Sequence, residues 1–343
     1  MLPEGQGAQP IRVGGQAVIE GVMMRSPTSM AIAVRRPGGA IVVREQPWVS
    51  LWDRLKFLKW PFFRGTVVLI ESLGNGIQAL TFSANQAADD GTGDAPAEKL
   101  GSVAMAGTIA LALALGVALF VVLPHFLTQA LAQFTTWGIS VRGVRFHLID
   151  GAIKIALFLA YVWGISRLRD IRRVFEYHGA EHMSIFAYEK GLPLTVDNVR
   201  RFATLHPRCG TSFLMVVIVV SILFFCAAFP LMPALPSLPT VLRHLVYVAI
   251  KIPLLLPIAG VSYEVIRLAG KREHNPLLRA AVLPGMWLQR ITTQPPSDDQ
   301  IEVAILSLKK VLWREAVGNR GGEASEEVYP DFADAVQRVG APL

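Results

Sequence analysis

The chain has 343 residues, of which 52% are hydrophobic and only 17% are charged. Since about a quarter of the residues in a soluble domain are charged, this is the composition of a membrane protein. The formal net charge of +7 does not indicate a nucleic-acid partner, because no basic stripe is interleaved with aromatic residues that could stack on bases. The two cysteines, Cys209 and Cys226, form no disulfide framework and favour a reducing compartment.

Residues 11–48 are predicted to form a small β region. Large and small apolar residues alternate over residues 30–34, and a Pro-Gly-Gly turn follows before the pattern resumes. The preceding run, residues 14–25, begins with two glycines and lacks the lysine of a phosphate-binding loop, so we interpret the glycines as a turn or a bulge. Glu20 and Arg25 are charged residues in this otherwise apolar run and are candidate site residues.

Residues 50–85 are expected to form amphipathic helices at a membrane surface. Ser50 is a predicted N-cap for a short helix. In the longer helix, residues 61–84, an apolar stripe lies opposite a polar one, which indicates an interfacial helix. A fifth membrane span is the alternative for this segment. Residues 86–101 are predicted to be a polar linker.

A membrane domain is predicted over residues 102–267. Four of its segments are apolar and long enough to cross the hydrocarbon core of a bilayer. They are residues 103–123, 148–166, 211–229 and 245–266. Pro124 is expected to end the first segment, and Pro253 and Pro257 are expected to interrupt the fourth.

Lysine and arginine are distributed unevenly between the loops that join these segments. The loop between the second and third segments holds eight of them, whereas the 124–147 loop holds two and the 230–244 loop holds one. By the positive-inside rule, both termini and the 167–210 loop are expected to be cytoplasmic.

Residues 276–316 are predicted to form an interfacial helix and then an amphipathic one, and a capping box from Ser297 to Gln300 begins the second helix. The tail, residues 317–343, is expected to be mobile. The resulting fold class is an α-helical polytopic membrane protein with four transmembrane helices. A cytoplasmic cap is expected to contain the small N-terminal β region and the amphipathic helices.

The clearest chemical signal is the segment His178-Gly179-Ala180-Glu181-His182. Two histidines four residues apart project from the same face of a helix, where both can bind one metal ion. Glu181 is placed to act as a general base on water, in the H-x-x-E-H order of the inverted zincins. The segment therefore predicts a metal site with a catalytic carboxylate.

His206 and Cys209 add an imidazole and a thiol to the same predicted loop. Together with His178 and His182 they form a ligand set that suits zinc or another borderline-soft divalent ion. Four ligands would make a closed structural site, whereas three would leave a position for water, and both alternatives stay open. The structural alternative is that the histidines only form hydrogen bonds at the interface and that Cys209 is a small apolar residue.

Charged residues inside the predicted spans form a third group of candidates. Asp150 and Lys154, four residues apart in the second span, are expected to form a mutually dependent ion pair with a structural role. A structural role is also expected for Lys251. Glu264, near the cytoplasmic end of the fourth span, is expected to pair with Arg267 or to contact water, and a position beside the metal site is the alternative.

Five segments of the chain carry a family resemblance. They are residues 14–25 (GGQAVIEGVMMR), 176–182 (EYHGAEH), 206–213 (HPRCGTSF), 262–264 (SYE) and 288–296 (LQRITTQPP). With these segments the chain resembles the YqhQ-like family of bacterial membrane proteins, a family of unknown function, from Arg12 to about Trp313. The resemblance implies a multi-pass protein of the bacterial plasma membrane. For the His/Glu segment it implies a metal-dependent enzyme, without a known reaction or substrate.

Three classes of function are compatible with these features. The first is a metal-dependent hydrolase at the cytoplasmic membrane surface, with Glu181 as general base. The second is a non-enzymatic assembly or biogenesis factor or scaffold for membrane proteins, in which a metal would be structural. The third is a small transporter or channel, suggested by the prolines and charges in the spans. The expected cofactor is a divalent ion, first of all zinc, and the expected partners are the lipid bilayer and either a second copy of the chain or another membrane protein.

Overall fold

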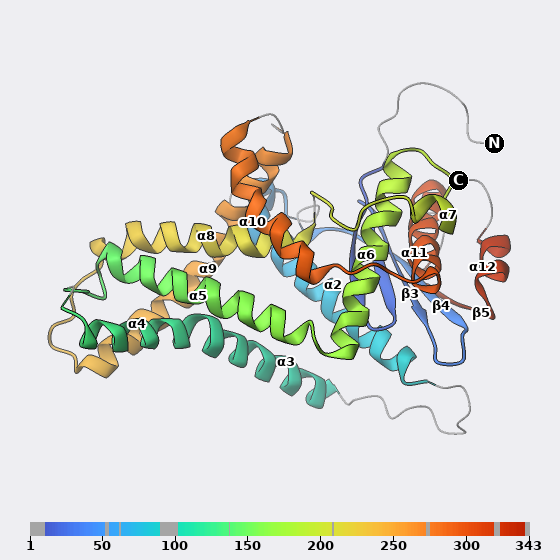
Figure 1. Ribbon diagram of the computed structural model, residues 1–343. Helices are drawn as coiled ribbons and strands as arrows, with labels where there is room; N and C mark the ends of the chain where they lie inside the picture. The colour runs from blue at the N-terminus through green and yellow to red at the C-terminus, as the bar shows by residue number, and fades with distance from the viewer. Residues whose placement is uncertain are drawn as a thin grey trace.

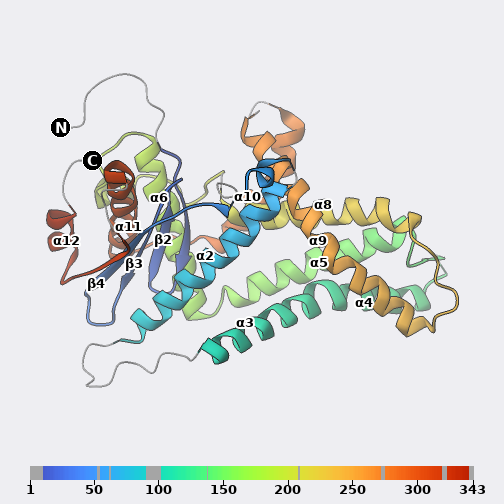
Figure 2. The same ribbon diagram turned by 180° about the vertical axis from the view of Figure 1, so that it is seen from behind.

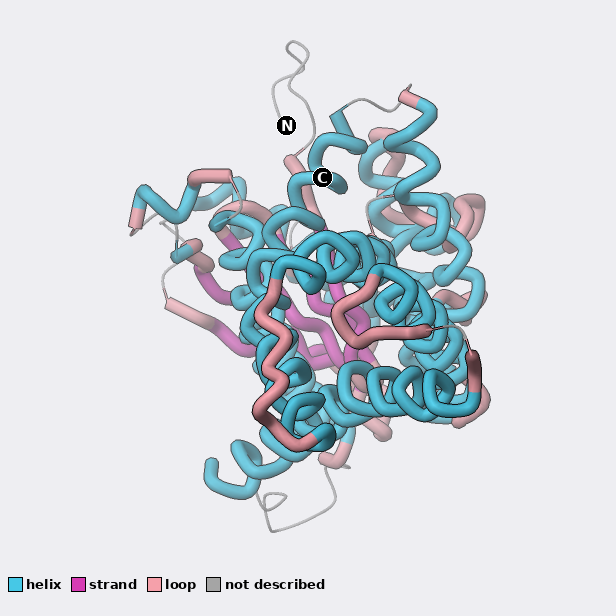
Figure 3. Tube along the Cα trace, turned by 90° about the vertical axis from the view of Figure 1, so that its left-hand side faces the viewer, coloured by secondary structure: helices cyan, strands magenta, loops and turns pink. Residues whose placement is uncertain are grey.

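The computed structural model describes residues 11–51, 55–61, 63–89, 102–136, 138–207, 209–271, 275–318 and 323–339. The described chain has two parts (Figure 1, and from behind in Figure 2). A sheet covered by helices forms one end of the molecule, and a bundle of long helices extends away from it. In a view along the bundle from its far end, the sheet lies behind the helices (Figure 3).

The sheet is antiparallel throughout, and its strands follow one another in chain order. The strands are β1 (Gly14–Val18), β2 (Gly21–Arg25), β3 (Ser29–Arg35), β4 (Ile41–Pro47) and β5 (Ser325–Tyr329). The first four confirm the predicted N-terminal β region. The interpretation of the two glycines as a turn or bulge is wrong, because both are paired residues of β1. The turn comes later, at Ile19 and Glu20, and Glu20 has a φ of 50°.

Successive residues of a strand point to opposite faces of the sheet. In this sheet both faces are buried, each in a different core. On one face, Ala31 belongs to a core shared with α6 (Arg169–Glu189) and α11 (Asp298–Val317). On the other face, Ile32 belongs to a core shared with α2 (Phe63–Ala87). The alternation read from the sequence therefore describes two cores rather than one buried and one exposed face.

The C-terminal tail takes up regular structure in its described part, so the expectation of a mobile segment over residues 317–343 is wrong for residues 323–339. Strand β5 pairs with β4, and α12 (Phe332–Arg338) follows it.

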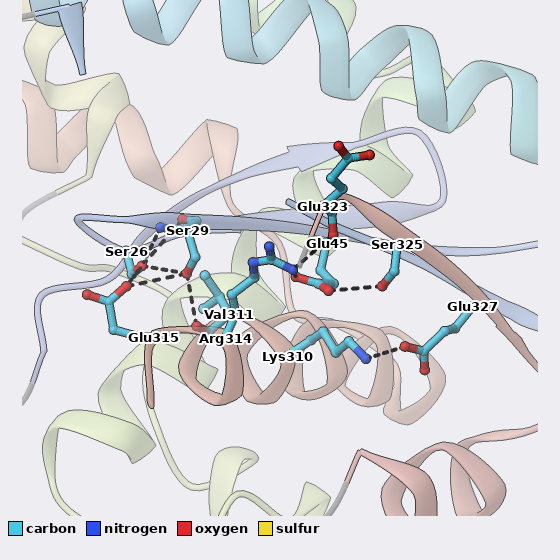
Figure 4. Close-up of polar contacts among 10 residues, drawn as sticks. All are labelled: Ser26, Ser29, Glu45, Lys310, Val311, Arg314, Glu315, Glu323, Ser325 and Glu327. Carbon is cyan, nitrogen blue, oxygen red and sulfur yellow. Dashed lines mark hydrogen bonds and ion pairs between the residues drawn. The ribbon is translucent and has the colours of Figure 1, made fainter. Parts of the chain in front are cut away.

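Polar contacts hold this tail to α11 and β4 (Figure 4). Arg314 of α11 forms a buried ion pair with Glu45 of β4, and the hydroxyl of Ser325 donates to the same carboxylate at 2.9 Å. Lys310 of α11 binds Glu327 of β5 at 2.6 Å. The tail is thus attached by ion pairs that a local sequence pattern does not predict.

Among the described residues, five helices are long and apolar enough to cross a membrane, one more than the four expected. They are Phe63–Ala87, Ala106–Phe134, Val144–Ile165, Gly210–Leu231 and Thr240–Ala269. The additional helix is α2, the segment predicted to be interfacial from its polar stripe. By length and composition alone, the described residues therefore contain five candidate spans and not the four expected from the sequence.

The prolines do not end or break the helices as expected. The first long helix consists of α3 (Ser102–Val117), the π-helical segment η2 (Ala118–Val122) and α4 (Leu123–Phe134) without interruption. Pro124 removes one backbone N–H and displaces the carbonyl four residues before it, and the wider π turn just ahead of it accommodates this loss. Helix α9 (Thr240–Lys271) likewise continues through Pro253 and Pro257.

The remaining helices complete the bundle and the cap. They are α5 (Val144–Ile165), α7 (Val196–Val199), α8 (Gly210–Ala228) with its 3₁₀ extension η3 (Phe229–Leu231), and α10 (Pro276–Thr292). The expected 167–210 loop is thus mostly helical. The predicted capping box of α11 is confirmed, with the Ser297 N–H donating to Oε1 of Gln300 at 2.9 Å.

Helix α2 uses its polar stripe for contacts inside the protein. The carboxylate of Glu71 accepts hydrogen bonds from the Ser50 hydroxyl at 2.7 Å and from the Leu51 N–H at 2.6 Å. The short helix expected after Ser50 falls partly on residues 52–54, outside the described residues, and its described remainder is the 3₁₀ turn η1 (Lys56–Lys59). Most of the expected 86–101 linker also lies outside the described residues.

Candidate metal centre

Three of the predicted ligands meet where α6 approaches the start of α8. His178 and His182 are one turn apart on α6, and Cys209 immediately precedes α8. One donor atom of each lies within 4.8 Å of the other two, and Nε2 of His178 is 3.2 Å from Sγ of Cys209. Since two ligands of a tetrahedral zinc ion are separated by about 3.3–3.7 Å, these three residues could hold a single ion.

Backbone carbonyls orient both histidine rings. Nδ1 of His178 is 2.8 Å from the carbonyl oxygen of Thr292, and Nδ1 of His182 is 2.5 Å from that of Thr204. A carbonyl oxygen only accepts, so each Nδ1 carries the hydrogen and each Nε2 presents a lone pair. Nε2 of His182 is buried and has no hydrogen-bond partner among the described residues. Histidine ligands of metals are held in this way.

The sulfur of Cys209 lies at the start of α8, beside His178. Cys209 is the N-cap of α8, where its sulfur accepts a hydrogen bond from the Thr211 N–H at 3.4 Å and lies 3.0 Å from the Thr211 hydroxyl. The thiolate is the form of cysteine that binds metals.

His206 does not join this group, so the prediction that four ligands converge on one point is not met. Its ring centre lies 5.5 Å from that of His182, and its Nε2 is 3.6 Å from Oε2 of Glu189. Burial, with a smaller effect of His182, lowers the pKa of His206 to about 4. The described geometry favours the three-ligand alternative, in which His206 packs beside the site.

Glu181 comes from the same turn of α6 as the two histidines and is 4% exposed. Its carboxyl group rests against β1, so closely that a Cβ on Gly15 would lie 2.8 Å from Cδ and Oε1. Burial raises the pKa of Glu181 to about 7, against smaller opposing effects of His178 and of the Gly15 backbone. A carboxylate with such a pKa can accept and release a proton near neutral pH.

Residues 288–296 form a further wall of the site, a role that the sequence did not reveal. The side-chain amide of Gln289 accepts from the His206 N–H at 2.8 Å and donates to the His206 carbonyl at 2.9 Å. The chain then crosses α6 so closely that a Cβ on Gly179 would lie 2.2 Å from the carbonyl oxygen of Gln294.

Several residues of the site were thus missed. A glutamine inside an apolar helix signals a buried amide that needs partners, so Gln289 could have been found from the sequence. Thr204 and Thr292 act through backbone carbonyls, which leave no side-chain signal. The role of Gly15 depends on a contact with α6, far away in the chain.

Glu20 and Arg25, the charged residues of the first motif, have partners other than the three ligands. Glu20 forms a two-pronged ion pair with Arg173 of α6, at 2.5 and 2.6 Å. The guanidinium of Arg25 lies 4.2 Å from the ring centre of Trp48. The first contact joins the β1–β2 turn to α6, and the second lies within the sheet region, so both residues have a structural explanation.

The charged residues of the long helices also have other partners. Glu264 of α9 binds Arg64 of α2 in a two-pronged ion pair rather than joining the ligands. Lys154 lies 3.6 Å from Oδ2 of Asp150, as predicted, but Lys251 is closer to that atom, at 3.0 Å. The pair expected within α5 is therefore a group of three that includes α9.

Four segments from different parts of the chain converge on this centre: residues 14–25, 176–182, 206–213 and 288–296. A family model described as "Protein of unknown function (DUF1385)" matches residues 60–314. The chain belongs to this family. It is also 35% identical to the uncharacterized protein YqhQ of Bacillus subtilis (strain 168). The alignment spans 323 residues and covers 93% of this chain and 98% of YqhQ. The resemblance to the YqhQ-like family is thereby confirmed. No solved structure matches the chain.

Proposed function

We propose that this DUF1385 protein crosses the bacterial plasma membrane four times and that α2 is not one of the crossings. The sheet and the helices that cover it form one core: β2 and β3 pack with α6 and α11. These elements must therefore lie on one side of the membrane. The number of crossings between β4 and α6 is then even.

Three candidate helices lie between β4 and α6 in the chain: α2, the α3–α4 helix and α5. The α3–α4 helix and α5 are joined by a short connection. Together they make two membrane crossings, which is the even number required. A crossing by α2 would place β1–β4 across the membrane from α6, with which they pack. The contacts of α2 with the sheet also favour a helix that lies beside the cap.

The orientation of this arrangement follows from charge. The connection that contains α6 and α7 holds eight lysines and arginines, whereas residues 124–147 and 230–244, at the other end of the bundle, hold three in total. The positive-inside rule then places the cap and both termini in the cytoplasm.

We further propose that His178, His182 and Cys209 bind one divalent ion, zinc in the first place. The observation that carries this proposal is the orientation of the two imidazoles: both Nδ1 atoms are bound to backbone carbonyls, so both Nε2 atoms are available beside a helix-capping sulfur. Three ligands of this kind leave a fourth position open. Such an open position is typical of a catalytic rather than a structural zinc site.

The chemistry that fits this centre is hydrolysis at the cytoplasmic membrane surface. A bound ion would supply a Lewis acid that polarises an ester, amide or phosphoester bond. Glu181 would take a proton from the attacking water, a role that suits a buried carboxylate with a pKa of about 7. Gly15 would keep that carboxylate in place from the side of β1.

Elemental analysis of the purified protein tests the metal site directly. We expect about one zinc, manganese or iron per chain, lost in the double variant His178→Ala, His182→Ala and in Cys209→Ser. His206→Ala is the matched control, because this histidine packs beside the ligands without joining them, and it should retain the metal. A folded wild-type protein without metal would overturn the proposal.

A membrane-protein assembly factor with a structural metal is the second candidate. Exposed apolar side chains next to the cap, including Phe57 and Trp60 near η1 and Leu283 and Trp287 of α10, favour it, since such side chains can bind lipid or a client helix. Glu181→Gln separates the two candidates in a complementation assay. An enzyme would lose function while metal content and folding persist, whereas a scaffold would function normally.

A further inference from the structure

A second group of ionisable side chains lies inside the helical bundle, apart from the metal centre. Asp150 and Lys154 come from α5, His125 from α4, and His244 and Lys251 from α9. Each of the five is less than a tenth exposed. Buried ionisable groups within apolar helices are costly and usually have a function.

Hydrogen bonds connect four of these residues in one chain. The Lys251 ammonium donates to Oδ2 of Asp150 at 3.0 Å and to Nδ1 of His125 at 3.2 Å. Because Nδ1 of His125 accepts, its Nε2 carries the hydrogen. That hydrogen points to Nδ1 of His244, 2.9 Å away. Donors and acceptors therefore alternate without a break from Asp150 to His244.

The charges of this group do not balance. Two ammonium groups, those of Lys154 and Lys251, share the one carboxylate of Asp150. With neutral imidazoles the group has a net charge of +1, and its side chains are buried, which makes the charge costly. The Phe225 ring, whose centre is 5.5 Å from Nζ of Lys251, offsets part of this cost by a cation–π contact. The loss of one proton removes the net charge.

We propose that this group binds one exchangeable proton and passes it between Lys251 and His244. Nζ of Lys251 gives a proton to Nδ1 of His125, and the Nε2 hydrogen of His125 moves to Nδ1 of His244. His244 then releases its own Nε2 hydrogen to water. Lys251 is left as a neutral amine, both imidazoles have changed tautomer, and the net charge of the group is zero.

Other titratable groups face this relay without taking part in it. His147 of α5 packs against Phe229 in a tilted arrangement, with ring centres 4.4 Å apart. Cys226 of α8 lies 3.8 Å from the Val144 carbonyl, and Arg243 adjoins His244 on α9. Among the described residues, no hydrogen bond continues the relay from Lys154 toward α6. The hydrogen-bonded chain therefore ends at His244, which makes the group a proton-binding site rather than a path through the bundle.

The test is a titration of the intact protein in lipid nanodiscs, followed by NMR of ¹⁵N-labelled histidine rings and assigned with single His→Gln variants. In the wild type, we expect His125 and His244 to change tautomer together at one midpoint between about pH 5 and 9. Lys251→Met should abolish this shared transition. Lys154→Met should keep it and move its midpoint upward by about one pH unit or more, because a neighbouring positive charge is removed.

Two further variants keep the proposal testable if Lys251→Met or Lys154→Met does not fold. His244→Gln breaks only the last hydrogen bond and leaves the ion pairs intact, so it should fold and remove the transition of His125. His147→Gln, outside the relay, should leave the transition unchanged. Independent titration of the two histidines, no titration of either, or an unchanged transition in His244→Gln would each overturn the proposal.

Discussion

Gly15 of β1 is in close contact with the carboxyl group of Glu181 on α6. A Cβ at position 15 would lie 2.8 Å from the carboxyl carbon of Glu181 and 2.8 Å from the carbonyl oxygen of Met23. The second atom belongs to the backbone of the neighbouring strand and cannot turn aside. A methyl group at this position must therefore displace the buried carboxylate, the strand or both.

We predict that Gly15→Ala lowers the free energy of unfolding by about 1–3 kcal/mol, as overpacking usually does. If Glu181 is a base, the variant should also reduce function while metal content persists, because the atoms nearest to the added Cβ belong to Glu181 and Met23 and not to the ligands. Gly14→Ala is the matched control: a Cβ at position 14 meets nothing within 4 Å. Thermal unfolding and complementation of both variants check the prediction, which equal behaviour of the two would contradict.

Asp150 is the residue on which the buried charges of the bundle depend. Its removal leaves two ammonium groups without a counterion, whereas removal of either lysine leaves one ion pair. We predict that Asp150→Ala destabilises the folded protein most, by about 3–5 kcal/mol, and that Lys154→Met has the smallest effect of the three single changes. Yields of folded protein from membranes and melting temperatures in detergent would give this order.

The same reasoning changes the expected outcome of a double substitution. With Asp150 and Lys154 alone in a pair, replacing both by apolar residues would restore stability. Because Lys251 shares the carboxylate at 3.0 Å, the double variant Asp150→Ala, Lys154→Met should remain unstable. Normal accumulation of that variant would show that Lys251 has another counterion or has released its proton.

The ion pair between Arg314 and Glu45 should contribute more to stability than any exposed pair of the cap. Its side chains are 4% and 2% exposed, whereas both side chains of the Arg44–Glu326 pair are 37% exposed. We predict that Arg314→Met costs about 3–5 kcal/mol, because it leaves a buried carboxylate without its partner. Arg44→Met should cost at most about 1 kcal/mol.

Hydrogen exchange gives a local measurement of the same effect. Amides of β5 should lose protection in Arg314→Met, since Ser325 donates to the carboxylate that the arginine neutralises. They should keep it in Arg44→Met. Equal protection in the two variants would mean that strand pairing alone holds the tail.

Local periodicity predicted much of this fold. Alternation over residues 30–34 identified β3, and the capping box identified the start of α11. The two histidines and Glu181 were recognisable because a helix places residues four apart on one face. Each of these signals depends only on neighbours in the chain.

The parts that sequence reasoning missed depend on contacts between distant segments. The pairing of β5 with β4 joins residues almost 290 positions apart, and Lys251 joins Asp150 from another helix. The positions of His206 and Glu264 were decided by neighbours such as Gln289 and Arg64. No spacing rule within one segment could have supplied these partners.

Helix α2 distinguishes four membrane crossings from five, and its two ends provide the test. Lys56 lies before α2 and Ala88 after it, and both are exposed. If α2 stays beside the cap, cysteines introduced at these two positions share one side of the membrane. If α2 crosses, they lie on opposite sides, and the packing of β1–β4 against α6 would have to be abandoned.

We predict that Lys56→Cys and Ala88→Cys react with a membrane-impermeant maleimide in inside-out vesicles and stay unlabelled in right-side-out vesicles. Ser140→Cys and Ser237→Cys, in the exposed connections at the far end of the bundle, should show the reverse. The unsubstituted protein sets the background, because Cys209 and Cys226 are themselves only partly buried. Labelling of positions 56 and 88 from opposite sides would contradict four crossings. Labelling of both from the outside would keep the four crossings but invert the orientation, and it would place the metal centre outside the cytoplasm.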